Sequence, residues 1–97
     1  MTARSRDERT DGDRDLLAEA QLGSERAFGR LAEHHTGGLE IYCELMLGCP
    51  DRGHEAVLET LLRAWCELDS VDAHVSARMW LYGLATGVCL EDRDWTD

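Results

Sequence analysis

Residues 51–68, which read DRGHEAVLETLLRAWCEL, decide the fold class. The segment carries large apolar side chains three or four residues apart, which is the spacing of one helix face. They are Val57, Leu58, Leu61, Leu62 and Trp65. Pro50 precedes the segment and stops any helix before it, because proline has no backbone N–H to continue the hydrogen-bond ladder. We therefore predict a helix over residues 51–68.

Helical patterns continue on both sides of this segment. Ser24 is a good N-cap for a helix whose first apolar positions are Phe28, Leu31, Ala32 and His35. Gly37 and Gly38 weaken its middle, so the pattern allows one long helix with a soft centre or two helices with a kink, ending at Gly48. A shorter helix capped by Asp11 or Asp13 and ended by Gly23 precedes it. Ser76 can cap a last helix that carries Trp80, Leu81, Leu84, Ala85 and Val88.

The predicted fold is all-α, a small bundle of about four helices, because no strand-like alternation competes with these patterns. Ninety-seven residues suffice for one domain. Residues 1–12 are polar and predict a disordered arm, residues 13–92 the helical domain, and residues 93–97 a frayed acidic tail. Trp65 and Trp80 are expected to pack in the core, because each buries a large apolar area.

The charge of the chain speaks against binding to duplex DNA without a partner. Twenty acidic residues face ten basic ones, all of them Arg, which gives a net charge of −10. A protein that grips duplex DNA unaided needs a basic surface to displace phosphate counterions. No segment is long and apolar enough for a transmembrane helix or a secretion signal, so we expect a cytoplasmic protein without membrane contact.

The chemistry-bearing residues do not form a catalytic pattern. Cys43, Cys49, Cys66 and Cys89 contain no closely spaced pair of the kind that binds zinc, and are expected to be reduced and mostly buried. The sequence shows no nucleophile–base pair and no phosphate-binding glycine loop. We expect no catalytic residue, no metal, no cofactor and no enzyme activity.

Three motifs, in order along the chain, resemble one protein family. They are residues 15–28 (DLLAEAQLGSERAF), residues 59–65 (ETLLRAW) and residues 78–82 (RMWLY). Together they resemble the region-2 domain of sigma-70 family RNA polymerase sigma factors, of the small extracytoplasmic-function (ECF) type. The likeness covers roughly residues 13–92. It implies a non-enzymatic role in transcription initiation.

The resemblance also implies which residues bind. In the family, the exposed face of the third helix docks on the β′ clamp of core RNA polymerase, which here implies Glu55, Leu58, Glu59 and Leu62. Leu58 replaces a glutamine of the family motif. The family holds unstacked bases of the promoter −10 element with the last helix and the loop before it, which implies His74, Arg78 and Tyr82. Such DNA binding is expected to be weak for this chain alone.

The likeness to the family is degenerate at the positions implied for DNA binding. Gly83, Thr86 and Gly87 stand where the family carries Arg or Asn, and an acidic tail replaces an Arg-rich one. The chain stops at residue 97 without the region-4 domain that reads the −35 element, so we expect either a truncated protein or a stand-alone region 2. Two alternatives stay open: a decoy that binds an anti-sigma factor or core polymerase without DNA, and a helical adaptor or oligomer, which an exposed apolar patch would support.

Overall fold

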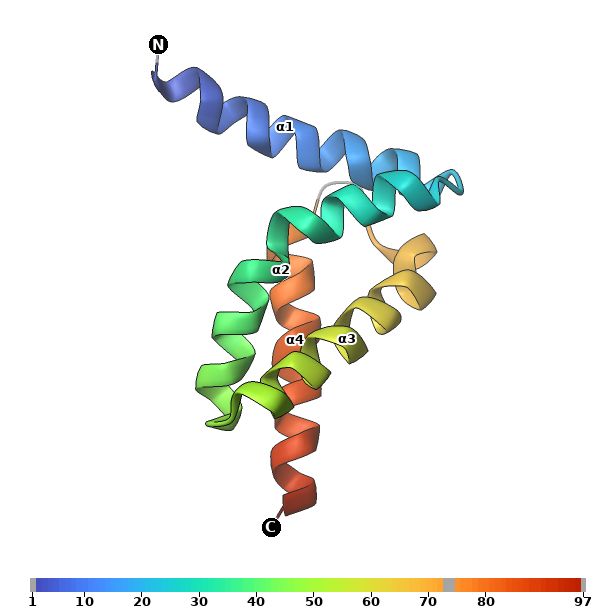
Figure 1. Cartoon of the computed structure of the whole chain (residues 1–97). Coiled ribbons are helices and arrows are strands. Elements are labelled where there is room, and N and C mark those ends of the chain that lie inside the picture. The colour runs from blue at the N-terminus through green and yellow to red at the C-terminus, as the bar shows by residue number, and fades with distance from the viewer. Residues whose placement is uncertain (1, 73–74, 97) are drawn as a thin grey trace.

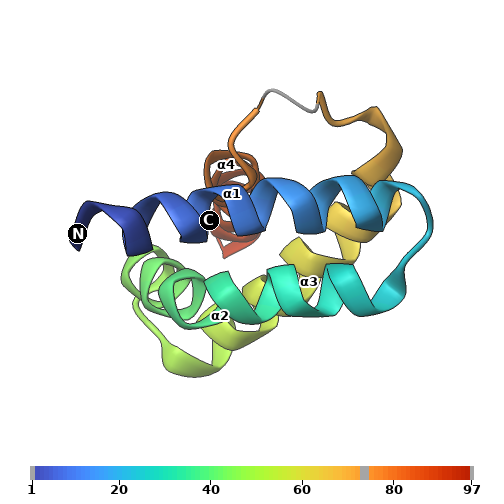
Figure 2. The ribbon, with the colours of Figure 1, turned by 90° about the horizontal axis from the view of Figure 1, so that it is seen from above.

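The computed structural model describes the backbone of residues 2–72 and 75–96, and the side chains of residues 12–72 and 75–92. Within these ranges the chain forms four α-helices and no strand, which confirms the all-α bundle (Figures 1 and 2). The helices are α1 (Thr2–Gln21), α2 (Glu25–Leu47), α3 (Pro50–Glu67) and α4 (Ala77–Thr96), and a 3₁₀ turn, η1 (Leu68–Ser70), follows α3.

The structure differs from the sequence-based expectation at both ends of the chain. Helix α1 begins at Thr2, within the segment expected to be a disordered arm, and α4 continues to Thr96, through the expected frayed tail. A polar segment has few apolar side chains to bury, but this does not prevent its backbone from forming a helix. Neither segment contains proline to interrupt one. The assignment of residues 13–92 as the domain stays a prediction.

Helix α2 is one long helix that changes direction near its middle (Figure 1). The Ser24 side chain accepts a hydrogen bond from the Ala27 backbone N–H at 3.1 Å, which confirms Ser24 as its N-cap. At the bend, the Thr36 hydroxyl donates to the Ala32 carbonyl at 2.6 Å, an interaction that often bends helices. Gly38 follows and leaves room for the Tyr82 hydroxyl of α4, which would collide with a Cβ atom there.

The core is built on Leu17, Leu31, Leu39, Val57 and Leu81, each at most 2% exposed. One cluster joins α1 to the first part of α2, and the other joins α2, α3 and α4. Cys43 and Cys89 lie together in the second cluster, both fully buried. Burial, together with the neighbouring Cys89 thiol, raises the pKa of Cys43 to about 12. Cys66 is exposed, unlike the expected buried thiols.

Helix α3 packs through a face that overlaps only partly with the one its large apolar residues predicted. Val57 of that stripe is buried, together with the small residues Gly53, Ala56, Thr60 and Ala64, whereas Leu58 and Leu62 are 52% and 62% exposed. The expectation that Trp65 is a core residue is wrong, since it is 40% exposed and packs edge-on against Phe28 at 5.1 Å. Trp80 is half-buried and packs against both clusters. Over the described residues, no helix combines the length and apolarity that a bilayer-spanning segment needs.

Candidate protein-docking face on helix α3

Four side chains form an exposed face along α3. They are Glu55, Leu58, Glu59 and Leu62, which follow the i, i+3, i+4, i+7 spacing of one helix face, and all four are exposed. We call this set the α3 face. The structure therefore brings together on one surface all four residues that the family resemblance implied for polymerase docking.

The packing of α3 explains why two leucines face solvent. Gly53 lies so close to the backbone of α2 that a Cβ atom would be 2.9 Å from Glu44 Cα. This close approach draws the small-residue face of α3 inward and leaves the opposite side free. Single exposed leucines are common in soluble proteins, but neighbouring ones on a helix are a feature of surfaces that bind another protein.

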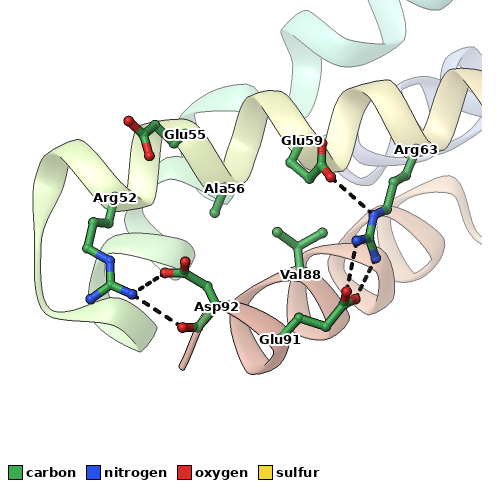
Figure 3. Close-up of a pocket in the computed structure, with 8 residues that line it drawn as sticks. All are labelled: Arg52, Glu55, Ala56, Glu59, Arg63, Val88, Glu91 and Asp92. Atoms are coloured by element: carbon green, nitrogen blue, oxygen red, sulfur yellow. Dashed lines mark hydrogen bonds and ion pairs between the residues drawn. The ribbon is translucent and has the colours of Figure 1, made fainter. Parts of the chain in front are cut away.

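A groove of about 270 Å³ lies beside the α3 face, between α3 and α4 (Figure 3). Both arginines that α3 contributes to it are paired with acidic side chains of α4. Arg63 makes two hydrogen bonds to the Glu91 carboxylate, at 2.6 and 3.0 Å, and Arg52 contacts Asp92 at 2.5 Å. The hydrogen bond from Arg63 lowers the pKa of Glu91 below its usual value.

These pairs leave the α3 face acidic. Glu59 is 3.7 Å from Arg63, which is already held by Glu91, and Glu55 has no ion pair among the described side chains. Glu55 and Glu59 both line the groove, and Figure 3 shows the Glu55 carboxylate directed away from the two arginine pairs. Two carboxylates beside two exposed leucines suit a partner that offers basic and apolar side chains together.

The residues implied for DNA binding are placed less favourably. Arg78 is exposed, and its guanidinium carbon lies 5.6 Å from the centre of the Tyr82 ring. Tyr82 is half-buried and packs edge-on against Tyr42 at 5.3 Å, so it is less available than a free surface ring. Thr86 donates to the Tyr82 carbonyl at 2.8 Å. His74 lies outside the described residues.

Sequence reasoning missed one polar cluster between α1 and α2. The Asp13 carboxylate, expected as a helix cap, lies 2.8 Å from His34 Nδ1 and 2.8 Å from His35 Nε2. The adjacent histidines were the only available signal, and they do not indicate which residue of another helix they contact. The cluster fixes α1 against α2 and lies outside the α3 face.

Comparison with known proteins points to one family. The chain is 36% identical over 73 residues to the RNA polymerase sigma factor CnrH of Cupriavidus metallidurans, which covers 74% of this chain and 38% of CnrH. It is 35% identical over 63 residues to the ECF RNA polymerase sigma factor SigG of Mycobacterium tuberculosis, covering 65% of this chain and 17% of SigG.

The chain thus spans well under half the length of these relatives. No protein-family model and no solved structure matches it. A match that covers 74% of the chain must include its middle, and with it all of α3 and nearly all of α2. The chain therefore contains a sigma-70 region-like domain of the ECF type.

Proposed function

We propose that this chain acts in transcription initiation as a sigma-factor-like binding protein rather than an enzyme. Its α3 face would dock on the β′ clamp of core RNA polymerase. The observation that carries the proposal is the exposure of Glu55, Leu58, Glu59 and Leu62 on one side of α3 in a chain similar to ECF sigma factors.

Each part of the α3 face has a separate role in this proposal. Glu55 and Glu59 are four residues apart and can pair with basic side chains of the clamp. Leu58 and Leu62 supply apolar area between them, which contributes affinity at about 25 cal/mol per Å² removed from water before the costs of association. The carboxylates select and orient the partner, and the leucines hold it.

Charge reversal on the α3 face tests the docking proposal. We expect Glu55→Arg with Glu59→Arg to abolish co-purification with core polymerase, because like charges would meet at the interface. The matched control is Glu19→Arg with Glu33→Arg, which makes the same change in net charge at exposed positions of α1 and α2. Circular dichroism checks that both variants stay helical.

A second variant tests the apolar part of the α3 face without changing its charge. Leu58→Ser with Leu62→Ser leaves net charge unchanged and removes the apolar part of the face, and we expect it also to lose co-purification. Retention of polymerase by both α3 variants would contradict the proposal. Equal loss in the control at α1 and α2 would assign the effect to overall charge instead.

Two versions of the function differ in what α4 does. In the sigma-like version, Arg78, Tyr82 and His74 contact the promoter −10 element once polymerase is bound. In the decoy version, the chain occupies core polymerase or an anti-sigma factor without binding DNA. The decoy version is favoured by Gly83, Gly87 and Thr86, which leave α4 uncharged where the family carries basic groups, and by Glu91 and Asp92 below them.

Fluorescence anisotropy with core polymerase distinguishes the two versions. The sigma-like version predicts a larger signal for a −10 non-template oligonucleotide than for a scrambled one, and loss of that difference in Arg78→Ala. Equal signals for the two oligonucleotides, with polymerase still bound, would support the decoy.

A further inference from the structure

The two arginines of α3 that line the groove are each a helical neighbour of a carboxylate of the α3 face. Arg63 follows Glu59 by four residues, and Arg52 precedes Glu55 by three. Oppositely charged residues at these spacings form ion pairs in isolated helices, and an acidic residue four positions before a basic one is the favourable order. On its own, α3 would therefore neutralise part of the α3 face with its own arginines.

In the folded chain both arginines have closer partners at the end of α4 (Figure 3). Arg63 Nη1 and Nη2 donate to the two Glu91 carboxylate oxygens at 2.6 and 3.0 Å. Its Nε is 3.7 Å from Glu59 Oε1, which is beyond hydrogen-bond distance. Arg52 Nη2 is 2.5 Å from the Asp92 carboxylate and also donates to the Asp92 carbonyl at 3.4 Å. Both guanidinium groups thus make their shortest ionic contacts with α4.

Contact geometry favours Glu91 over Glu59 as the partner of Arg63. A guanidinium group that binds both oxygens of one carboxylate makes one of the strongest ionic contacts in proteins, whereas Glu59 offers a single longer contact. Among the effects that raise the pKa of Arg63, the hydrogen bond to Glu91 is the largest, and the charge of Glu59 contributes less. Arg63 is therefore held mainly by α4.

Apolar packing holds the two acidic residues of α4 in place. Val88 and Cys89, which lie on the preceding turn, are 6% and 0% exposed and belong to the cluster that joins α2, α3 and α4. Because this turn is anchored, Glu91 and Asp92 meet the arginines without ordering a free segment. The entropic cost that makes most exposed ion pairs weak is reduced accordingly.

We propose that Glu91 and Asp92 are positioning residues for the α3 face. By holding the two arginines on α4, they keep the Glu55 and Glu59 carboxylates available to basic side chains of a partner. This inference rests on the proposed docking to polymerase and extends it to a second helix. The acidic end of α4, which is unfavourable for contact with DNA, would then serve docking.

NMR of the chain alone tests the exchange of partners without polymerase. The reporter is the Nε–Hε resonance of Arg63. We expect Glu59→Gln to shift this resonance more in a chain that also carries Glu91→Gln than in one that keeps Glu91, because Glu59 becomes the main partner once Glu91 is neutral. A response to Glu59→Gln that is the same in both backgrounds would overturn the proposal.

Binding to core polymerase tests the consequence for docking. Glu91→Gln with Asp92→Asn should weaken binding at least about threefold, the scale on which a single exposed ion pair acts. The matched control, Glu19→Gln with Glu33→Gln, makes the same change in net charge at exposed positions of α1 and α2, and should weaken binding less. Circular dichroism checks that both variants stay helical.

Removal of the released arginines separates positioning from the attachment of α4. Arg52→Gln with Arg63→Gln, added to the α4 variant, should restore binding, although this chain also lacks both ion pairs to α4. The matched control adds Arg26→Gln with Arg30→Gln instead, which removes the same charge at exposed positions of α2, and should not restore binding.

The two measurements can fail independently. Equal weakening by the α4 variant and by the control at α1 and α2, or binding that stays weak after the α3 arginines are removed, would overturn the proposal. If the unmodified chain did not bind polymerase, the docking proposal would fail, and the resonance of Arg63 would still decide whether Glu91 withholds Arg63 from Glu59.

Discussion

At the scale of single residues, Gly53 sets the distance between α2 and α3. It is buried, and a Cβ atom at this position would lie 2.9 Å from both the Cα and the N atom of Glu44. Because these are backbone atoms, no side-chain rotation can relieve the contact. The residue therefore controls how far α3 lies from α2, and with it which side of α3 faces solvent.

We predict that Gly53→Ala destabilises the protein by up to about 2 kcal/mol, because overpacking a tight core usually costs about 1–3 kcal/mol and alanine regains part of this through helix propensity. This cost exceeds the gain in helix propensity, which is about 1 kcal/mol for replacing a helical glycine by alanine. Urea unfolding followed by circular dichroism measures the difference. The matched control is Gly29→Ala, at an exposed position of α2. A Cβ atom there meets nothing within 4 Å, so the gain in helix propensity should raise stability. A Gly53→Ala protein as stable as this control would contradict the packing argument.

At the scale of elements, the C-terminal part of α4 is held to α3 by ion pairs as well as by apolar packing. Arg63 binds Glu91, and Arg52 binds Asp92, on either side of the apolar residues Ala56 and Val88 (Figure 3). The two pairs join residues 28 and 40 positions apart in sequence. They thus fix the end of α4 to the helix that carries the α3 face.

The depressed pKa of Glu91 predicts how this attachment responds to acid. Its pKa is lower in the folded chain than the ordinary 4.5, so its stabilising effect is present above pH 4.5 and is lost as the pH falls through the folded value. Glu91→Gln should melt below the unmodified chain at neutral pH, and the gap should close in acid, where the protonated carboxyl resembles the amide. Thermal unfolding at several pH values measures it, with Glu33→Gln as the exposed control. A gap that does not change with pH would contradict this role of the ion pair.

The boundaries of the helices inside the chain could be predicted from the sequence, unlike the outer ends of α1 and α4, because their causes are local. Ser24 and Ser76 each accept a hydrogen bond from the backbone N–H three residues ahead, and Gly48 ends α2 in a left-handed conformation just before Pro50. The rotation of α3 could not be predicted in this way. Val57 and Leu58 belong to one apolar pattern, and only the contact between Gly53 and α2 determines that the first is buried and the second exposed.

The residues of the candidate site also differ in how far they could be predicted from local sequence. The family resemblance implied the four residues of the α3 face, and helical spacing alone keeps them on one side of α3. That this side faces solvent depends on the packing of α3, which no local pattern indicates. The partners of Arg52 and Arg63 lie on α4, and no local pattern indicates a contact between side chains so far apart in sequence. The resemblance implied Tyr82 as a DNA-contacting residue, but it is half-buried, with its hydroxyl against Gly38 of α2.

At the scale of the whole molecule, the net charge of −10 bears on the proposed docking to polymerase. In that proposal the α3 face offers carboxylates to a basic partner, so long-range attraction would speed the encounter. Salt shortens the range of this attraction, from a Debye length of about 30 Å at 0.01 M to about 3 Å at 1 M.

We therefore predict that salt slows association with core polymerase. The association rate with core polymerase should fall as salt rises, with little change in the dissociation rate, because screening acts mainly on encounter. Stopped-flow fluorescence of labelled chain measures this rate, and Glu19→Arg with Glu33→Arg should reduce it modestly through net charge alone. A variant with neutral Gln at positions 55 and 59 should show a flatter salt dependence than that control, because it loses carboxylates at the contact itself. If polymerase association instead strengthened with salt, the acidic α3 face could not be what attracts the partner, and apolar contact through its leucines would remain as the driving force.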